Sequence, residues 1–386
     1  MATTGAVGQA WRADVTGSGS IEPWDGTAAL DWYVAADDRW HDPKTDSGVR
    51  HRRIEGTAVF ETKLRVPGGD VVQRVWSVAD AGGYTLIEVT NDSSLPIACA
   101  FTRPDVVSHR PLADVPIRGI DLPEGSVLLP IGHRSTVVVG LAHGRPRPAL
   151  PAQLPSSDAV VRGWVGRALA GSRLYRRETR MAARVRAAGC VALWGGPPAP
   201  DEDPERFLLT VLELVRMGEW DQRATRAVVD EVAWCVERTL RASSPLGRPA
   251  LDAAAAVLSV MGEHRAVRDL LRLMRSDALP TMAFADENPH IEAVAAVERA
   301  VATGTVLFPD GVPSEWIGSA FEAHGLLAGP SSRVSVAVRW HGRNAAVLWE
   351  VSGEPVTLTS PSVPGWSAAA PRGEALWMLE SPSLRS

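Results

Sequence analysis

Residues 250–275 read ALDAAAAVLSVMGEHRAVRDLLRLMR, and the architecture of this chain follows from them more directly than from any other stretch. Apolar residues recur at helical spacing on both sides of Gly262, with Val267, Leu270 and Met274 forming the stripe of the second half. A joint of one residue forces two helices to lie antiparallel, because the chain has no length to travel further. The stretch therefore predicts an αα-hairpin.

The segments around this hairpin have the same period. Amphipathic helices are expected over Pro204–Met217 and Gln222–Arg241, and another over Pro289–Ala302. The last has Asn288 as N-cap and proline at the first helical position, a common combination at helix starts. The middle of the chain is thus predicted to be a set of helical hairpins.

The first third of the chain instead alternates with period two. Phe60, Leu64 and their apolar neighbours point one way and polar residues the other, a pattern typical of strands with one solvated face. Gly, Pro, Asn and Asp clusters separate five such runs, which predicts an antiparallel sandwich. The expected strands are Ala58–Val66, Val71–Val78, Tyr84–Thr90, Pro96–Thr102 and Thr136–Leu141.

Strands return at the C-terminal end. Val334 to Trp340 alternates apolar and polar residues, His341 to Asn344 forms a turn, and Ala346 to Val351 runs back as an antiparallel partner. Val356–Thr359 and Ala375–Leu379 add further strands. Because a lone hairpin is marginally stable, we expect a small sheet here that is covered by another layer.

The predicted fold class is therefore α+β and multidomain. An antiparallel β-sandwich is assigned to residues 1–150, an arginine-rich linker helix to 151–190, a helical-hairpin domain to 191–330 and a small β-sheet to 331–386. The linker has a local excess of arginine, and arginine side chains can bind the phosphates of a nucleic acid. A solvated helix explains it better, since only Trp164 and Tyr175 are available to stack on bases.

Composition excludes several classes. The 3 cysteines are far apart and without metal-ligand spacing, and the sequence has no phosphate loop, dinucleotide fingerprint or nucleophile elbow. We therefore expect no metal and no cofactor. No stretch has the composition of a secretory signal or a membrane span, so we expect a cytoplasmic protein that does not bind membranes.

The order of these regions, together with several local phrases, resembles six-hairpin glycosidases of the glucoamylase and glycogen-debranching type. The phrases are Phe308–Pro313, Trp316–Gly318, Glu322–His324 and Arg339–Gly342. The resemblance implies a toroid of helical hairpins and a carbohydrate ligand. Since the helical region is too short for a complete toroid, we expect a partial one, which a second copy or a partner subunit would complete.

A glycosidase needs two carboxylates about 5–10 Å apart, one to protonate the leaving oxygen and one to activate water or attack carbon. The candidates are Glu322, in a segment with tryptophan and histidine, and Asp286 and Glu287, in a loop before a predicted helix. Helix capping and stabilisation by the helix dipole explain Asp286 and Glu287 without catalysis. The sequence therefore offers candidate acids but no identified pair.

Tryptophan is unusually frequent, with 14 residues against 6 Phe and 3 Tyr. Flat indole rings stack on sugar rings, although tryptophan is also a large core residue. Trp194, Trp316 and Trp340 are the candidate ligand contacts because glycine or proline accompanies them, and His324 and His341 are candidate donors to sugar hydroxyls.

These observations favour a non-catalytic protein that binds carbohydrate or another partner. The first alternative is a glycoside hydrolase that acts on an oligosaccharide or glucan through paired carboxylates. The second alternative is nucleic-acid binding through the arginine-rich helix.

Overall fold

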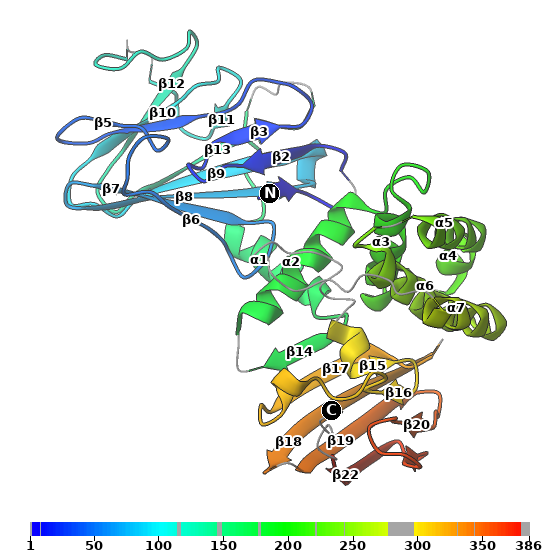
Figure 1. Ribbon diagram of the computed structural model, residues 1–386. Coiled ribbons are helices and arrows are strands. Elements are labelled where there is room, and N and C mark those ends of the chain that lie inside the picture. Colours follow the sequence, from blue (N-terminus) through cyan, green and yellow to red (C-terminus); the bar gives the residue numbers. More distant parts are fainter. Residues whose placement is uncertain are drawn as a thin grey trace. The chain divides into compact units, whose positions relative to one another are not determined.

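The computed structural model describes residues 2–7, 9–113, 117–144, 149–176, 179–220, 222–242, 244–276, 297–329, 331–342 and 344–379. It confirms a mixed α+β fold with several antiparallel sheets (Figure 1). The chain divides into two compact units, Met1–Val165 and Gly166–Ser386. None of the helices in the described ranges is both long enough and apolar enough to cross a bilayer.

Unit 1 consists of three antiparallel sheets. Their strand orders are β11-β13-β9-β8-β7-β6, β12-β10-β4-β5 and β1-β2-β3. The strands are β1 Thr3–Gly5, β2 Arg12–Val15, β3 Ile21–Pro23, β4 Trp32–Ala35, β5 Trp40–His41, β6 Arg50–Arg53, β7 Phe60–Val66, β8 Gly69–Val78, β9 Tyr84–Asn91, β10 Ile97–Phe101, β11 Val107–Ser108, β12 Val127–Ile131 and β13 Thr136–Ala142. The five strands expected from the sequence are all present, with ends shifted by one or two residues.

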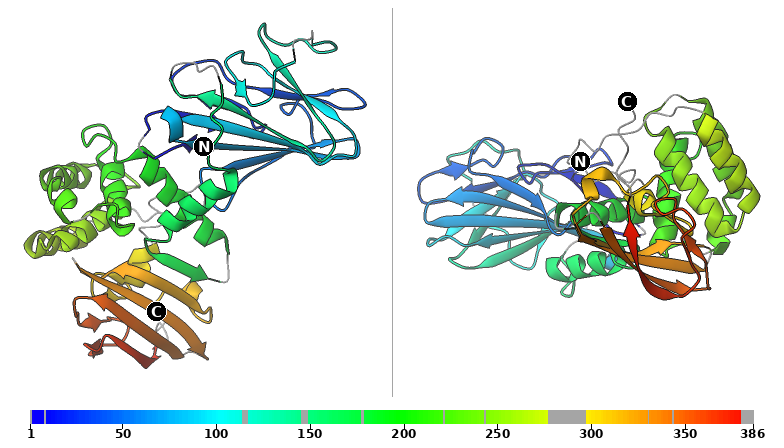
Figure 2. Two further views of the ribbon diagram at one scale, coloured as in Figure 1. Left: turned by 180° about the vertical axis from the view of Figure 1, so that it is seen from behind. Right: turned by 60° about the horizontal axis from the view of Figure 1, so that its bottom comes forward.

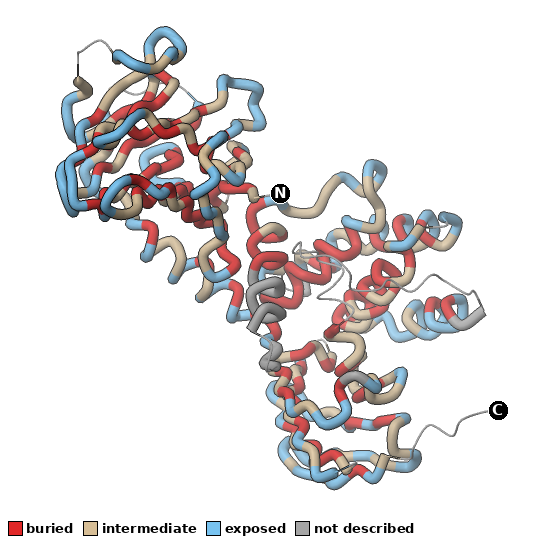
Figure 3. The backbone as a smooth tube through the Cα atoms, turned by 60° about the vertical axis from the view of Figure 1, so that its left-hand side comes forward, coloured by how far each residue is buried: buried red, intermediate tan, exposed pale blue. Residues whose placement is uncertain are grey.

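The core of unit 1 lies between the six-stranded sheet and the two smaller sheets. Trp32 and Phe101 from the four-stranded sheet meet Phe60 and Ile87 from the six-stranded sheet, and all four are at most 1% exposed. The second face of the six-stranded sheet is also covered, because Trp76 and its neighbours pack against residues 150–161. The central strands β8 and β9 are therefore buried on both faces, and Figure 3 colours the buried residues of this unit red.

A buried chain of hydrogen bonds links three strands of unit 1. Thr4 Oγ1 donates to the carbonyl oxygen of Ala58 at 3.2 Å and lies 3.1 Å from Ser77 Oγ. Ser77 Oγ is 2.9 Å from Thr85 Oγ1, which is 3.0 Å from Nε2 of His143. Because Thr4 uses its only proton on Ala58, each hydroxyl must accept from the next, and Nε2 of His143 carries the proton.

Unit 2 combines helices with two sheets. The helices are α1 Ser157–Ala168, which crosses from unit 1, α2 Thr179–Gly195, α3 Pro204–Arg216, α4 Gln222–Arg226, α5 Val229–Arg241, α6 Gly247–Met261 and α7 His264–Ser276. The strands are β14 Arg173–Arg176, β15 Ala302–Thr303, β16 Val306–Leu307, β17 Phe321–Leu327, β18 Ser332–His341, β19 Asn344–Gly353, β20 Leu358–Thr359, β21 Ser367–Ala368 and β22 Arg372–Met378.

The predicted αα-hairpin is confirmed as α6 and α7. Gly262 ends α6 in the left-handed conformation, with φ +79°, and its backbone N–H bonds back to the carbonyl oxygens of Leu258 and Ser259. This conformation is strained for residues with a Cβ atom, so glycine is the favoured residue for the joint. α3 begins at an N-cap, because Asp203 accepts from the N–H of Arg206 at 3.0 Å.

Two parts of the helical region differ from expectation. The helix expected over Gln222–Arg241 is divided into α4 and α5 near Val228, whose φ of −115° is not helical. The expected linker helix is interrupted by β14, because pairing with β17 outweighs the local helical pattern. The predicted start at Asn288–Pro289 lies outside the described residues, and residues 297–301 are helical.

The C-terminal strands belong to a five-stranded antiparallel sheet in the order β14-β17-β18-β19-β22 (Figures 1 and 2). Both β14 and β17 come from sequence before the expected boundary at residue 331. Phe308, Trp316, Val336 and Trp377 belong to the apolar core beneath one face of this sheet. A small sheet, β15-β16-β20-β21, contributes Leu358 and other residues to that core.

Candidate functional site

The structure brings three of the predicted site residues together in unit 2. Glu322 on β17 and Trp340 and His341 at the end of β18 line one open groove of about 680 Å³. We call it the sheet-end groove; its full lining is Gly318, Ala320, Phe321, Glu322, Val338, Arg339, Trp340 and His341. The volume is within the range of about 300–1,000 Å³ that is typical of small-molecule sites.

The other predicted residues lie elsewhere. Trp316 is 5% exposed and its ring meets that of Phe321 edge-on at 5.0 Å, so its position is that of a core residue. Trp194 is 8% exposed at the end of α2. Asp286 and Glu287 fall outside the described residues.

Polar contacts orient the side chains of the sheet-end groove. Nε2 of His324 lies 3.2 Å from one oxygen of Glu322, and Nη2 of Arg339 lies 3.9 Å from the other. The indole N–H of Trp340 donates to the carbonyl oxygen of Ser319 at 3.0 Å, which fixes the ring at the wall of the groove. Strand alternation places Trp340 with Val338 on the core side of the sheet and Glu322 and Arg339 on the opposite side, so the groove at the sheet end combines an indole from one face with polar groups from the other.

A second groove, of about 400 Å³, opens on the same sheet. We call it the mid-sheet groove; it is lined by His324, Ser335, Val336, Ala337, Leu348, Trp349, Glu350, Arg372 and Gly373. Nη2 of Arg372 pairs with Glu350 at 2.7 Å, and the hydroxyl of Ser335 accepts from the N–H of Gly325 at 3.2 Å. His324 lies on β17, at one end of this groove. The Arg372–Glu350 ion pair lies on β22 and β19, at the other end.

Two further carboxylates share a small cavity of about 40 Å³. Asp252 on α6 and Glu298 in the helical residues 297–301 both line it, together with Arg299. Burial raises the pKa of Glu298 to about 7, against the opposing effect of Arg216. Burial likewise raises the pKa of Asp252 to about 6, opposed by Arg299 and Arg248. Such a cavity holds a few waters but is far below the size of a typical ligand site.

Sequence reasoning did not identify this pair. Asp252 interrupts an otherwise apolar run, Leu251 followed by Ala253 to Val257, and a single acid on the buried side of a helix was the available signal. Glu298 lies in the predicted helix Pro289–Ala302, where an acid does not stand out from its neighbours, so it gave no comparable signal. Raised pKa values at neighbouring acids are typical of catalytic sites, but also of buried ion networks.

Glu298 belongs to such a network. Arg216, 1% exposed, donates through Nε to Glu213 at 2.7 Å and makes a second, shorter contact through Nη2. Its Nη1 reaches the carbonyl oxygen of Ser172 at 3.0 Å, the Ser172 hydroxyl at 2.7 Å and Glu298 at 3.4 Å. Arg333 on β18 donates to the backbone carbonyl oxygen of Arg216 at 3.0 Å. The network therefore ties α3 to the five-stranded sheet.

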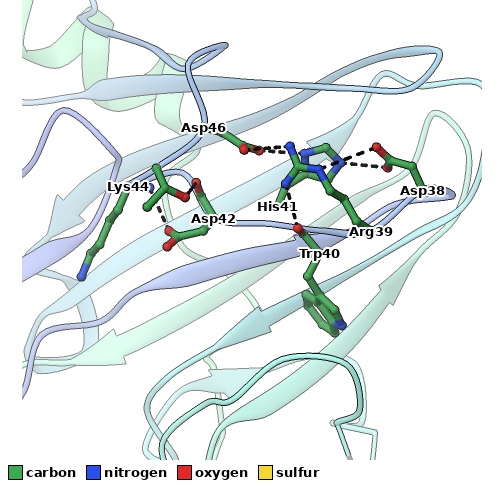
Figure 4. Close-up of polar contacts among 8 residues, drawn as sticks. Asp38, Arg39, Trp40, His41, Asp42, Lys44 and Asp46 are labelled. Atoms are coloured by element: carbon green, nitrogen blue, oxygen red, sulfur yellow. Dashed lines mark hydrogen bonds and ion pairs between the residues drawn. The ribbon is translucent and has the colours of Figure 1, made fainter.

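Unit 1 has its own polar cluster, around His41 (Figure 4). Nδ1 of His41 is 2.7 Å from Asp46 and Nε2 is 3.0 Å from Asp38. Both ring nitrogens of His41 therefore face carboxylate oxygens. Burial opposes ionisation of Asp46, but its hydrogen bonds from Arg39 and His41 lower its pKa overall. The cluster closes the loop that follows β5.

Within the described residues, no group of three or more His, Cys, Asp and Glu side chains has the arrangement of a metal site. No protein-family model matches this sequence, and a comparison with curated proteins finds no significant match. We therefore infer function from the geometry of the grooves and from the chemistry of their side chains.

Proposed function

We propose that this chain is a carbohydrate-binding protein without glycosidase activity, and that the ligand binds in the sheet-end groove. The observation that carries this proposal is the groove of about 680 Å³ at the ends of β17 and β18, which Trp340, Glu322, Arg339 and His341 all line. The face of an indole ring provides apolar contact for the C–H face of a sugar ring, and the three charged or polar groups can form hydrogen bonds with its hydroxyls. The resemblance to six-hairpin glycosidases supports the same ligand class.

The groove has one carboxylate. All eight lining residues lie in the described part of the chain, and Glu322 is the only acid among them. Hydrolysis by the usual route needs a second acid on the other side of the scissile bond. Glu322 is also held by His324 and lies near Arg339, contacts that suit a fixed acceptor of hydroxyl protons. These features support binding without cleavage.

The test is a binding screen against immobilised oligosaccharides with Trp340→Ala and Arg339→Ala. Both variants should lose binding by about tenfold or more, the loss expected for removing one strong contact. Trp24→Ala is the matched control, because this tryptophan is 54% exposed in unit 1 and lies outside the groove. Unchanged binding by Trp340→Ala and Arg339→Ala would place the ligand elsewhere and overturn the proposal.

A second candidate function is glycoside hydrolysis by Asp252 and Glu298, favoured because both acids line one cavity and have raised pKa values. The cavity is too small for a sugar in this conformation. Release of reducing sugar from a glucan panel is the assay. Activity that disappears in both Asp252→Asn and Glu298→Gln would support the hydrolase and contradict the non-catalytic proposal.

A further inference from the structure

We infer that the outer faces of α5 and α7 form an interface with a second copy of this chain. In this dimer, α7 of each copy packs antiparallel on α5 of the other, about a two-fold axis perpendicular to the helices. The inference concerns the helical layer of unit 2 and is independent of the ligand proposed above.

The outer face of α7 carries a stripe of arginines. The opposite face, between Val267 and Met274, joins the apolar core that α7 shares with α6. Arg265, Arg268 and Arg272 recur at intervals of three and four residues, so they lie in one exposed row. Asp269 is the ion-pair partner of both Arg265 and Arg272, at 3.9 and 3.2 Å, and Arg268 has no ion pair among the described residues. The stripe therefore keeps an excess of positive charge.

The outer face of α5 carries a complementary stripe. Asp230, Trp234 and Glu237 recur at intervals of four and three residues on its exposed side. Glu237 contacts Arg241 one turn later, whereas Asp230 has no ion pair in the described part of the chain. Trp234 is 38% exposed, and the guanidinium of Arg238 lies over its ring, 5.2 Å from the centroid. Carboxylates and an indole face are the groups that arginine side chains bind best.

The two stripes match in antiparallel register. The intervals along the α7 stripe are three and four residues, and those along the α5 stripe, read backwards, are the same. Antiparallel pairing therefore brings together three pairs of residues, each about one turn from the next: Arg265 with Glu237, Arg268 with Trp234, and Arg272 with Asp230. Parallel pairing would instead place Arg272 opposite Arg238, a contact between like charges.

α5 and α7 run in the same direction within one copy. The end of α5 lies beside the start of α6, because a Cβ atom at Gly247 would lie 3.7 Å from the side chain of Thr239. Arg226, just before α5, reaches the carbonyl oxygen of Met261 at the end of α6, at 3.2 Å. α5 is therefore antiparallel to α6, and α7 is antiparallel to α6 across the joint at Gly262. Figure 1 shows α5 and α7 together at the outer end of the helical layer.

Two-fold symmetry accommodates both contacts at once. An axis perpendicular to the helices reverses the direction of the partner's α5, which makes it antiparallel to α7. Trp234 lies five residues after the start of α5 and Arg268 four residues after the start of α7, so both are at about the same height. One axis at that height therefore sets each α7 on the partner's α5.

The interface is small and rich in charge. Both helices have 13 residues, a length of about 20 Å, which is short for a stable dimer interface. We therefore expect a dissociation constant of about 1–100 µM. Because the charged groups are exposed, association should weaken as the salt concentration rises.

Sedimentation velocity of the full chain over about 1–200 µM, a range that brackets this constant, tests the dimer. Arg272→Asp should weaken association by about tenfold or more, because the symmetry counts the lost ion pair and the new repulsion twice. The double variant Asp230→Arg with Arg272→Asp should restore it. Arg162→Asp is the matched control, since Arg162 is an exposed arginine of α1 in unit 1, and it should associate like the parent chain.

A mixture of Asp230→Cys and Arg272→Cys chains locates the contact. Under mild oxidation the mixture should form a disulfide-linked dimer and neither variant alone should do so, because the two positions face each other only across the axis. A chain that stays monomeric over the whole concentration range would overturn the inference. A dimer that Arg272→Asp does not weaken and that the mixture does not cross-link would also overturn it. A monomer whose binding to phosphatidylserine vesicles is lost in Arg268→Glu would assign the stripe to a membrane surface instead.

Discussion

Replacing Arg216 with methionine should destabilise unit 2 by more than an apolar core substitution of equal volume, which usually costs less than about 1.5 kcal/mol. The guanidinium is 1% exposed and is the buried cation shared by Glu213 and Glu298. Methionine fills a similar volume, so the substitution removes charge and hydrogen bonds without opening a large cavity. Glu298 can take up a proton, because burial already raises its pKa to about 7. Glu213, 3% exposed, would lose its buried cation.

The magnitude follows from this loss. Breaking a buried ion pair by removing one partner costs about 3–5 kcal/mol, since the remaining charge is desolvated and uncompensated. The carbonyl oxygen and hydroxyl of Ser172 would also lose their donor, at 3.0 and 2.7 Å. Because 1.4 kcal/mol corresponds to a factor of ten, opening of this region should become about 10²–10⁴-fold more frequent.

Hydrogen exchange followed by mass spectrometry is the appropriate assay, because it reports opening free energy segment by segment. Peptides from α3 and β18 should lose protection, whereas peptides from β8 in unit 1 provide the internal reference. Global unfolding is less suitable, since two compact units need not unfold together.

The double variant Glu213→Leu with Arg216→Met should recover most of the lost protection. Replacing both members of a buried pair by apolar residues is often neutral, because no charge remains to be desolvated. A loss below about fivefold in Arg216→Met would refute the assignment of a stabilising ion network. Equal losses in the single and double variants would show that shape, rather than charge, accounts for the effect.

Three further predictions concern pH and two positions in unit 1. The pKa of Glu298 is raised to about 7 in the folded chain, from about 4.3 in the unfolded chain, so the stability of unit 2 should fall as pH rises between those values. Thermal melts at pH 4–8 measure this fall, and Glu298→Gln should flatten the pH profile. Gly83→Ala should cost unit 1 about 1–3 kcal/mol in urea unfolding, because φ is +98° and a Cβ atom would lie 2.5 Å from Nδ1 of His143; a neutral effect would contradict this packing. Asp46→Asn should destabilise the loop after β5 by about 1–3 kcal/mol, because the hydrogen bond between the Asp46 carboxylate and His41 is lost. Faster hydrogen exchange of residues 38–46 is the expected result.

The strands and most helices were predictable because they depend on local period. Phe60 to Val66 alternates, and Val267 to Met274 follows a helical stripe, whatever the rest of the chain does. β14 was missed because Arg173 to Arg176 has no strand pattern of its own; its conformation comes from pairing with β17, far away in the sequence. Tertiary contacts of this kind outweigh local preference.

The candidate site was predictable in part, for a related reason. Glu322, Trp340 and His341 were chosen because glycine, tryptophan and histidine cluster near them, and the structure places them in one groove. Trp316 had the same sequence signal but points into the core. Asp252 had the opposite signal, an acid among alanines, and burial rather than any motif raises its pKa.

The pairing of β14 with β17 also has a consequence for synthesis and for dissection of the chain. Arg173 leaves the ribosome long before its partner His324, so the edge of the five-stranded sheet stays unpaired while the helices of unit 2 emerge. Nascent chains at that stage carry β14 without a partner strand, and an unpaired strand edge favours aggregation. A fragment cut at residue 331, where the sequence suggests a boundary, would lack two of its five strands, whereas a fragment that begins at Gly166 keeps all of them.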